Sequence, residues 1–213
     1  PKGMVFPTKY NINYSSVALL SIALNSVLIS KFKPFSNILV LGGGLLGQFT
    51  IQILNLMGHK VSLVEIRKKL KPISNKNGAK NFYQIDSSKN FKDEYDGVIS
   101  TLPSITNKMW EELTLSLKVS SKVVLVGAAS INISRSLFYS KRLRFISAYS
   151  YGSGRGEYEY EKLGKHESTK INSGPSISEL IYKSIDLISS KKINFDFIDN
   201  VFISSKTNIS EVL

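Results

Sequence analysis

The chain has 213 residues, of which 42% are hydrophobic and 21% charged, with a formal net charge of +12 and no cysteine. This composition is typical of a folded, water-soluble protein and excludes collagen-like, disordered and multi-pass membrane chains. Without cysteine, these residues form no disulfide, thiol nucleophile or cysteine-ligated zinc or iron–sulfur centre. A reducing compartment suits such a chain, and we expect it to be cytoplasmic.

The positive charges are mostly scattered lysines, with one short cluster at Arg67, Lys68 and Lys69. No basic stretch carries the interleaved aromatic residues that are typical of RNA- or DNA-binding segments. The sequence therefore predicts no nucleic-acid partner. The opposing hypothesis, binding of polyanions through net charge, predicts a strongly salt-dependent interaction.

The first apolar segment, residues 15–29, is interrupted by Ser21, Asn25 and Ser26. It falls short of the roughly 20 apolar residues that a membrane span needs. We expect a buried helix here and no membrane partner. The chain begins at Pro1 without an initiator methionine, so a processed or partial chain is one interpretation.

Short apolar segments bounded by glycine or polar residues predict six strands. They are residues 37–41, 60–65, 81–85, 95–101, 121–126 and 143–148, with a further candidate at 200–204. Helical patterns cover residues 48–57, 67–77, 108–117 and 176–189, and Pro72 is expected to weaken the second of these. Residues 149–170, rich in tyrosine, glycine and charge, predict an irregular segment.

Alternating strands and helices predict βαβ units and a parallel sheet. Apolar strands such as residues 38–41 and 123–126 lack a polar–apolar alternation, as expected when helices cover both faces. We therefore predict the α/β fold class, as a Rossmann-type doubly wound parallel sheet in the order 3-2-1-4-5-6, with helices on both faces.

The most specific motif is a glycine turn directly after the first predicted strand. Gly42, Gly44 and Gly47 fit the pattern G-x-G-x-x-G, which is specific for dinucleotide binding only between a strand and a helix. The first glycine permits a tight turn, the second lets the backbone approach a diphosphate, and the third lets the helix pack against the strand. The following helix would direct its free N–H groups at the phosphates.

An acidic residue supports this interpretation. Glu65 ends the second predicted strand, 18 positions after Gly47, near the expected offset of about 20. A carboxylate there accepts ribose hydroxyls and repels a 2′-phosphate, which favours NAD(H). Arg67 leaves NADP(H) as the alternative, because a basic side chain at that place suits a 2′-phosphate.

The arrangement resembles the cofactor-binding domain of the medium-chain dehydrogenase/reductase superfamily, the zinc-type alcohol dehydrogenase-like proteins. The segments that carry the resemblance are residues 17–28, 38–47, 77–80 and 122–127, and more weakly 150–155 and 190–195, as in two-domain oxidoreductases. It implies three parts: residues 1–35 as an N-terminal segment with a lead-in helix, 36–150 as the dinucleotide-binding domain, and 151–213 as a C-terminal extension packing on or beside it.

The resemblance also implies roles for residues at the strand ends. Leu45 and Leu46 would pack near the pyrophosphate of NAD, or of NADP. Thr101 and Leu102 would border the adenosine side, and Gly127 with Ala128 would lie by the nicotinamide.

The activity implied is NAD(P)-dependent oxidoreduction of a small-molecule alcohol or carbonyl substrate. The family carries its zinc ligands and substrate pocket in a catalytic domain before this region, so this chain is expected to hold no zinc site. That domain would be a separate partner, and a homodimer is a further possibility that the resemblance raises. The alternative is a non-catalytic NAD(H)-sensing regulatory module, which the fold alone does not distinguish from an enzyme.

Other motifs carry less weight. His59 and His166 are the only histidines, and we expect His59 to be an exposed turn residue. Tyr158 and Lys162 match the Y-x-x-x-K pattern of short-chain dehydrogenases, but the glycine turn lacks that family's form. Residues 152–155 are interpreted as a loop rather than an anion site.

Overall fold

The computed structural model describes residues 12–84, 94–128, 133–148, 152 and 175–198. Its sheet consists of parallel strands in the order β3-β2-β1-β4-β5-β6, which confirms the predicted doubly wound fold. The strands are β1 (Asn37–Leu41), β2 (Lys60–Val64), β3 (Ala79–Tyr83), β4 (Tyr95–Ser100), β5 (Leu117–Val126) and β6 (Arg144–Ala148).

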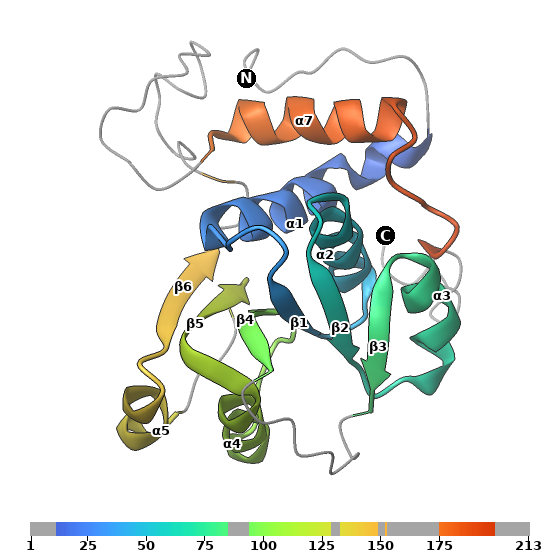
Figure 1. Cartoon of the computed structure of the whole chain (residues 1–213). Coiled ribbons are helices and arrows are strands. Elements are labelled where there is room, and N and C mark those ends of the chain that lie inside the picture. Colours follow the sequence, from blue (N-terminus) through green and yellow to red (C-terminus); the bar gives the residue numbers. More distant parts are fainter. Residues whose placement is uncertain (1–11, 85–93, 129–132, 149–151, 153–174, 199–213) are drawn as a thin grey trace, which may run out of the picture.

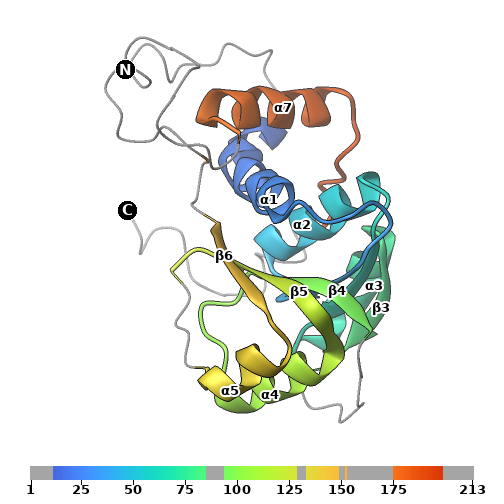
Figure 2. The same ribbon diagram turned by 60° about the vertical axis from the view of Figure 1, so that its left-hand side comes forward.

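Helices precede, connect and follow these strands (Figure 1). They are η2 (Ile12–Ser16), α1 (Val17–Ser30), α2 (Leu45–Leu56), η3 (Lys68–Leu70), α3 (Lys71–Lys76), α4 (Asn107–Ser116), α5 (Arg135–Ser140) and α7 (Ile177–Ser189). Figure 2 shows α4 and α5 on one side of the sheet and α1, α2 and α7 on the other.

The two faces of the sheet carry separate hydrophobic cores, because successive side chains of a strand point to opposite faces. In β1, Ile38 and Val40 pack in the core that α1, α2 and α7 share. Leu39 and Leu41 pack in the other core, around the fully buried Trp110 of α4. Burial on both faces explains why β1 is apolar after its first residue, Asn37.

The segment after residue 175 completes the first core. Helix α7 lies against α1 (Figure 1), where the buried hydroxyls of Ser21 and Ser184 are 3.0 Å apart. Beyond α7 the chain turns back towards α2, and Phe197 packs edge-on against Phe49 at 5.2 Å between ring centroids. Residues 175–198 are therefore part of the same packed unit as the sheet.

Most element boundaries shift by up to four residues from the sequence prediction, and three differences have a clear physical reason. Strand β5 begins at Leu117, earlier than predicted, because Leu117 is fully buried and pairs with Tyr95 ahead of an irregularity in the register. Pro72 does not break its helix but occupies the first turn of α3, where its missing N–H costs no hydrogen bond. Helix α5 was not predicted from the sequence, since none of its side chains is buried to give an apolar pattern.

Residues 13–30, which include α1, meet the length and hydropathy criteria for a membrane-crossing helix, and half of that stretch is buried inside the structure. Within α1, Leu20, Ala23 and Val27 are buried in the core shared with α2 and α7. This burial agrees with the predicted core helix. The candidate strand at residues 200–204 lies outside the described residues.

Candidate functional site

The glycine turn joins β1 to α2 at the carboxyl edge of the sheet. Gly42 has a φ of +92°, a backbone conformation that side chains disfavour, and its N–H donates to the carbonyl of Val64 at 2.9 Å. A methyl group on Gly47 would overlap the carbonyl oxygen of Gly42. The turn therefore requires glycine at its first and last positions, for the two steric reasons that the motif predicts.

Gly44 is the N-cap residue of α2 and faces open space. Its φ of −67° suits any residue, and a Cβ added there would lie 3.8 Å from its nearest neighbour, an Arg67 nitrogen. Neither a side-chain cap nor an acidic residue satisfies the first turn of α2. The N–H groups at this helix start, which have no partner within the helix, form a site for an anion. Leu45 and Leu46 are half-buried beside it.

Glu65 follows β2, and its buried carboxylate is held by four hydrogen bonds. The N–H of Gly43 donates to Oε2 at 2.7 Å and the N–H of Arg67 donates to Oε1 at 2.9 Å. The Arg67 guanidinium donates to both oxygens at 3.0 Å. These bonds occupy the acceptor positions of the carboxylate.

The electrostatic balance at Glu65 favours the ionised form. Burial alone raises the pKa of this carboxyl group, but the hydrogen bonds from Arg67 and Gly43 and the positive charge of Arg67 outweigh burial and lower the pKa. The hydrogen bonding of the guanidinium to Glu65 raises the pKa of Arg67. Burial of Arg67 lowers that pKa, but by less. The pair therefore stays charged, with the carboxylate inside and the half-exposed guanidinium outside, beside Gly44.

Thr101 and Leu102 follow β4 and close the other side of the turn. The Thr101 hydroxyl lies 3.0 Å from the carbonyl of Leu41 and 3.2 Å from that of Gly42. Leu102 packs closely on Gly42: a Cβ added to Gly42 would lie 2.9 Å from the Leu102 side chain. Both residues therefore fix the turn at the point between β1 and β4 where the strand order reverses, which is where doubly wound sheets bind ligands.

Gly127 and Ala128 follow β5, next to β4 at the same edge of the sheet. Both are exposed, Gly127 has a φ of +78°, and no atom lies within 4 Å of the position of a Cβ there. The structure thus brings the glycine turn into contact with Glu65, Thr101 and Leu102, with Arg67 nearby. The position at Gly127, after the neighbouring strand β5, is open.

Sequence reasoning missed two residues that define the turn. Gly43 fills a variable position of the motif, yet its N–H binds Glu65. Gln48 is fully buried in α2, and its Nε2 donates to the Gly43 carbonyl at 3.0 Å. No local signal distinguishes Gln48, because Thr50, Gln52 and Asn55 are also polar residues of α2.

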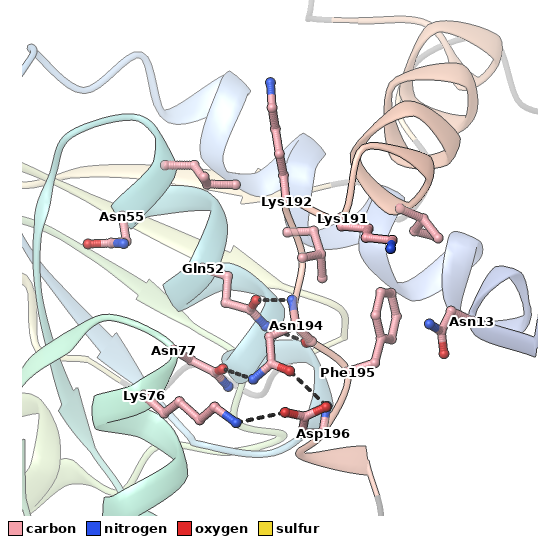
Figure 3. A pocket seen from close by; sticks show the side chains of 13 residues that line it. Asn13, Gln52, Asn55, Lys76, Asn77, Lys191, Lys192, Asn194, Phe195 and Asp196 are labelled. Carbon is pink, nitrogen blue, oxygen red and sulfur yellow. Dashed lines mark hydrogen bonds and ion pairs between the residues drawn. The ribbon is translucent and has the colours of Figure 1, made fainter.

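A cavity of about 530 Å³ lies away from the turn, among α2, α3 and the segment after α7 (Figure 3). Its lining is rich in amides and lysines. The polar and charged lining residues are Asn13, Gln52, Asn55, Lys76, Asn77, Lys191, Lys192, Asn194 and Asp196. Lys76 is bound to Asp196 at 2.7 Å, and both are well exposed.

The other sequence motifs have separate outcomes. His59 is not exposed as predicted: only 7% of its surface is accessible, because its ring packs edge-on against Phe32. Its burial lowers the pKa of the imidazole. His166, Tyr158 and Lys162 lie outside the described residues, as do residues 153–155 of the predicted loop.

Comparison with solved structures supports the predicted fold and the resemblance to the zinc-type alcohol dehydrogenase-like proteins. No protein-family model matches the chain, and no curated protein matches it. Similar structures include galactitol-1-phosphate dehydrogenase from Escherichia coli, with a TM-score of 0.68, 13% identity and coverage of 90% of this chain and 53% of that one. Acetophenone reductase from Geotrichum candidum, in complex with NAD, has a TM-score of 0.66, 17% identity and coverage of 92% and 52%.

A protein of Sinorhizobium meliloti described as a zinc-binding dehydrogenase, bound to NADP, gives a TM-score of 0.65, 17% identity and coverage of 89% and 52%. Alcohol dehydrogenases are also among the similar structures. The chain spans about half the length of these structures. The resemblance to the zinc-type alcohol dehydrogenase-like proteins is confirmed at the level of the fold.

Proposed function

We propose that this chain binds NAD(H) or NADP(H) at the carboxyl edge of its sheet, as the cofactor-holding part of an oxidoreductase. The observation that carries the proposal is the start of α2, which has no side-chain cap and leaves space at Gly44. The turn that leads into this helix accepts only glycine at Gly42 and Gly47. The NAD and NADP complexes of proteins with this fold support it.

The diphosphate of the dinucleotide would accept hydrogen bonds from the N–H groups at the start of α2. The positive end of the helix dipole adds favourable electrostatics there. Gly44 leaves room for this approach, while Leu45 and Leu46 would flank the diphosphate. When bound, the nicotinamide supplies hydride transfer, and this chain holds and orients it.

The two ends of the cofactor would lie along the sheet edge. We place the nicotinamide beside Gly127 and Ala128, where the edge is open, and the adenosine between Glu65 and Leu102. In the structure the exposed guanidinium of Arg67 covers the Glu65 carboxylate. A 2′-phosphate would meet Arg67 directly, whereas ribose hydroxyls would reach Glu65 after Arg67 moves aside.

The substrate would be a small alcohol or carbonyl compound, by analogy with the polyol dehydrogenase and reductase of the same fold. We propose that the groups that polarise it belong to a separate catalytic domain. The cofactor-binding part is proposed as residues 36–150, with residues 1–35 and 151–213 as flanking segments.

The test is a fluorescence titration of the full chain with NADH and with NADPH. A Gly44→Val variant is expected to weaken binding of both by roughly tenfold or more, a loss of about 1.4 kcal/mol, because the added side chain occupies the diphosphate position. Its backbone conformation accepts valine, so the unfolding midpoint should stay near that of the parent chain. Lys183→Val, an exposed substitution on α7, serves as the matched control.

Equal binding by the parent chain and Gly44→Val would place the dinucleotide elsewhere, and no binding by the parent chain would refute the proposal. Assay against a panel of alcohols with the full gene product then separates the enzyme from the alternative. Binding without turnover would favour a dinucleotide-sensing module.

A further inference from the structure

Three side-chain amides form a hydrogen-bonded chain from the C-terminal segment to the glycine turn. Asn194 donates to Asn77 at 3.1 Å, Asn77 donates to Gln48 at 2.9 Å, and Gln48 donates to the carbonyl of Gly43 at 3.0 Å. Gln48 and Asn77 are buried. We call Gln48, Asn77 and Asn194 the amide chain. Figure 3 shows its outer end, where Asn77 faces Asn194.

The direction of the amide chain is fixed. The second N–H of Gln48 donates to the Ser74 hydroxyl at 2.8 Å, and that hydroxyl donates to the carbonyl of Leu70 at 2.7 Å. Since Ser74 uses its only hydrogen on Leu70, it acts as an acceptor towards Gln48. Reversing the Gln48 amide would place oxygen against oxygen at both Ser74 and Gly43, which is costly in a buried site.

The last bond of the amide chain controls a peptide group of the turn. The peptide group between Gly43 and Gly44 is planar, so its C=O and N–H point in opposite directions. Holding the Gly43 carbonyl towards Gln48 therefore holds the Gly44 N–H away from Gln48. On the other side of Gly43, its own N–H is fixed by Glu65 at 2.7 Å. The buried side chains of Gln48 and Glu65 thus fix the peptide orientations of the turn. Its glycines alone have little preference for one backbone conformation.

We infer that Gln48 is a positioning residue for dinucleotide binding, and that Asn77 and Asn194 couple the segment after α7 to the glycine turn. This inference rests on the proposed function. A bound diphosphate needs the N–H groups of the turn in a single orientation, and the amide chain provides it. By reciprocity, an ordered turn stabilises the Asn194 end of the amide chain.

Gln52 provides a matched control one helical turn further along α2. It is buried like Gln48, and it also holds Asn194: its side chain accepts from the Asn194 N–H at 2.7 Å and donates to the Asn194 carbonyl at 3.1 Å. Among the described residues, Gln52 forms no hydrogen bond to the glycine turn. Its loss loosens the same C-terminal segment without releasing Gly43.

The experiment compares Gln48→Met with Gln52→Met in the full chain, measuring unfolding midpoints and affinities for NADH and NADPH. Both variants should lower the unfolding midpoint, because each leaves buried polar groups unpaired. Gln48→Met should weaken dinucleotide binding by roughly tenfold, the loss for about one hydrogen bond. Gln52→Met should change binding by less than about twofold. Equal losses of affinity in the two variants would overturn the inference.

A second measurement needs no dinucleotide. In NMR spectra of the ligand-free chain, Gln48→Met and Asn194→Ala should both shift the amide resonance of Gly44, and Gln52→Met, which leaves the bonds of the amide chain intact, should shift it less. An unmoved Gly44 resonance in Gln48→Met also overturns the inference. If that resonance moves but the parent chain binds no dinucleotide, the amide chain orients the turn and the proposed function is what fails.

Discussion

At the scale of single residues, Arg67 changes the interpretation of the acidic residue that ends β2. The carboxylate of Glu65 is not directed at solvent; it holds Gly43 on one side and Arg67 on the other. The group that a ligand meets first is the guanidinium, which presents a planar set of donors suited to phosphate. Under the proposed function, the choice between NAD(H) and NADP(H) would depend on Arg67, two positions after the acid.

The substitution Arg67→Ala should weaken NADPH binding by roughly tenfold, because a charge-assisted hydrogen bond is lost. NADH binding should hold or improve, since Glu65 becomes accessible to ribose hydroxyls. Parallel titrations with both cofactors measure the ratio of affinities. Lys69→Ala, an exposed neighbour in the same basic cluster, is the control. An unchanged ratio in Arg67→Ala would show that Arg67 does not contact the 2′-phosphate.

At the scale of elements, α7 belongs to the core although it follows the last strand of the sheet. Its start is defined by a capping box, in which Ser176 accepts from the Glu179 N–H and Glu179 accepts from the Ser176 N–H. Its apolar face buries Leu180 and Ile188 in the core shared with α1. Packing, rather than helix propensity alone, is therefore expected to hold α7 in place.

Leu180→Ala should lower the free energy of unfolding by about 2–5 kcal/mol, since it leaves a cavity in a fully buried site. Lys183→Ala on the same helix removes an exposed side chain and should change stability by less than about 0.5 kcal/mol. Chemical denaturation of both variants makes the comparison. Similar small effects in the two variants would mean that α7 contributes little to the stability of the chain.

At the scale of the whole molecule, ionisable groups with lowered pKa values should make the fold sensitive to acid. Burial lowers the pKa of His59. For Asp96, burial raises the pKa, but the bonds from Lys118 and the Asn37 N–H outweigh it and the net shift is downwards, as at Glu65. In all three cases the unfolded chain takes up a proton at a higher pH than the folded chain does.

Stability should therefore fall in two stages as the pH is lowered. The first loss begins below about pH 6.5, where histidine of the unfolded chain gains its proton, and the second below about pH 4, where its carboxyl groups do. His59→Phe should remove much of the first stage and leave the second. Unfolding midpoints between pH 8 and pH 3 test this, and a His166→Gln variant separates the contribution of the other histidine. A first stage that persists unchanged in His59→Phe would rule out this origin.

The sequence alone determined most strand positions and the glycine turn, and the sheet order followed from the fold in which such a turn occurs. These features depend on local signals: apolar runs form strands buried on both faces, and the spacing of Gly42, Gly44 and Gly47 reflects steric needs within one strand–turn–helix unit. Pro72 showed the limit of such signals, since its effect depends on which turn of a helix it occupies.

Only the tertiary structure decided how the turn is held and which side chains surround it. Gln48, Asn77 and Asn194 are far apart in the sequence, and nothing local indicates that their amides meet in one buried chain. The burial of His59 likewise depends on Phe32, and the burial of the Glu65 carboxylate depends on its bond to Gly43, both from other segments. Backbone conformation is fixed largely by adjacent residues, so the strand–turn–helix unit could be predicted from the sequence. Hydrogen bonds between distant side chains are fixed by tertiary packing, so the amide chain could not.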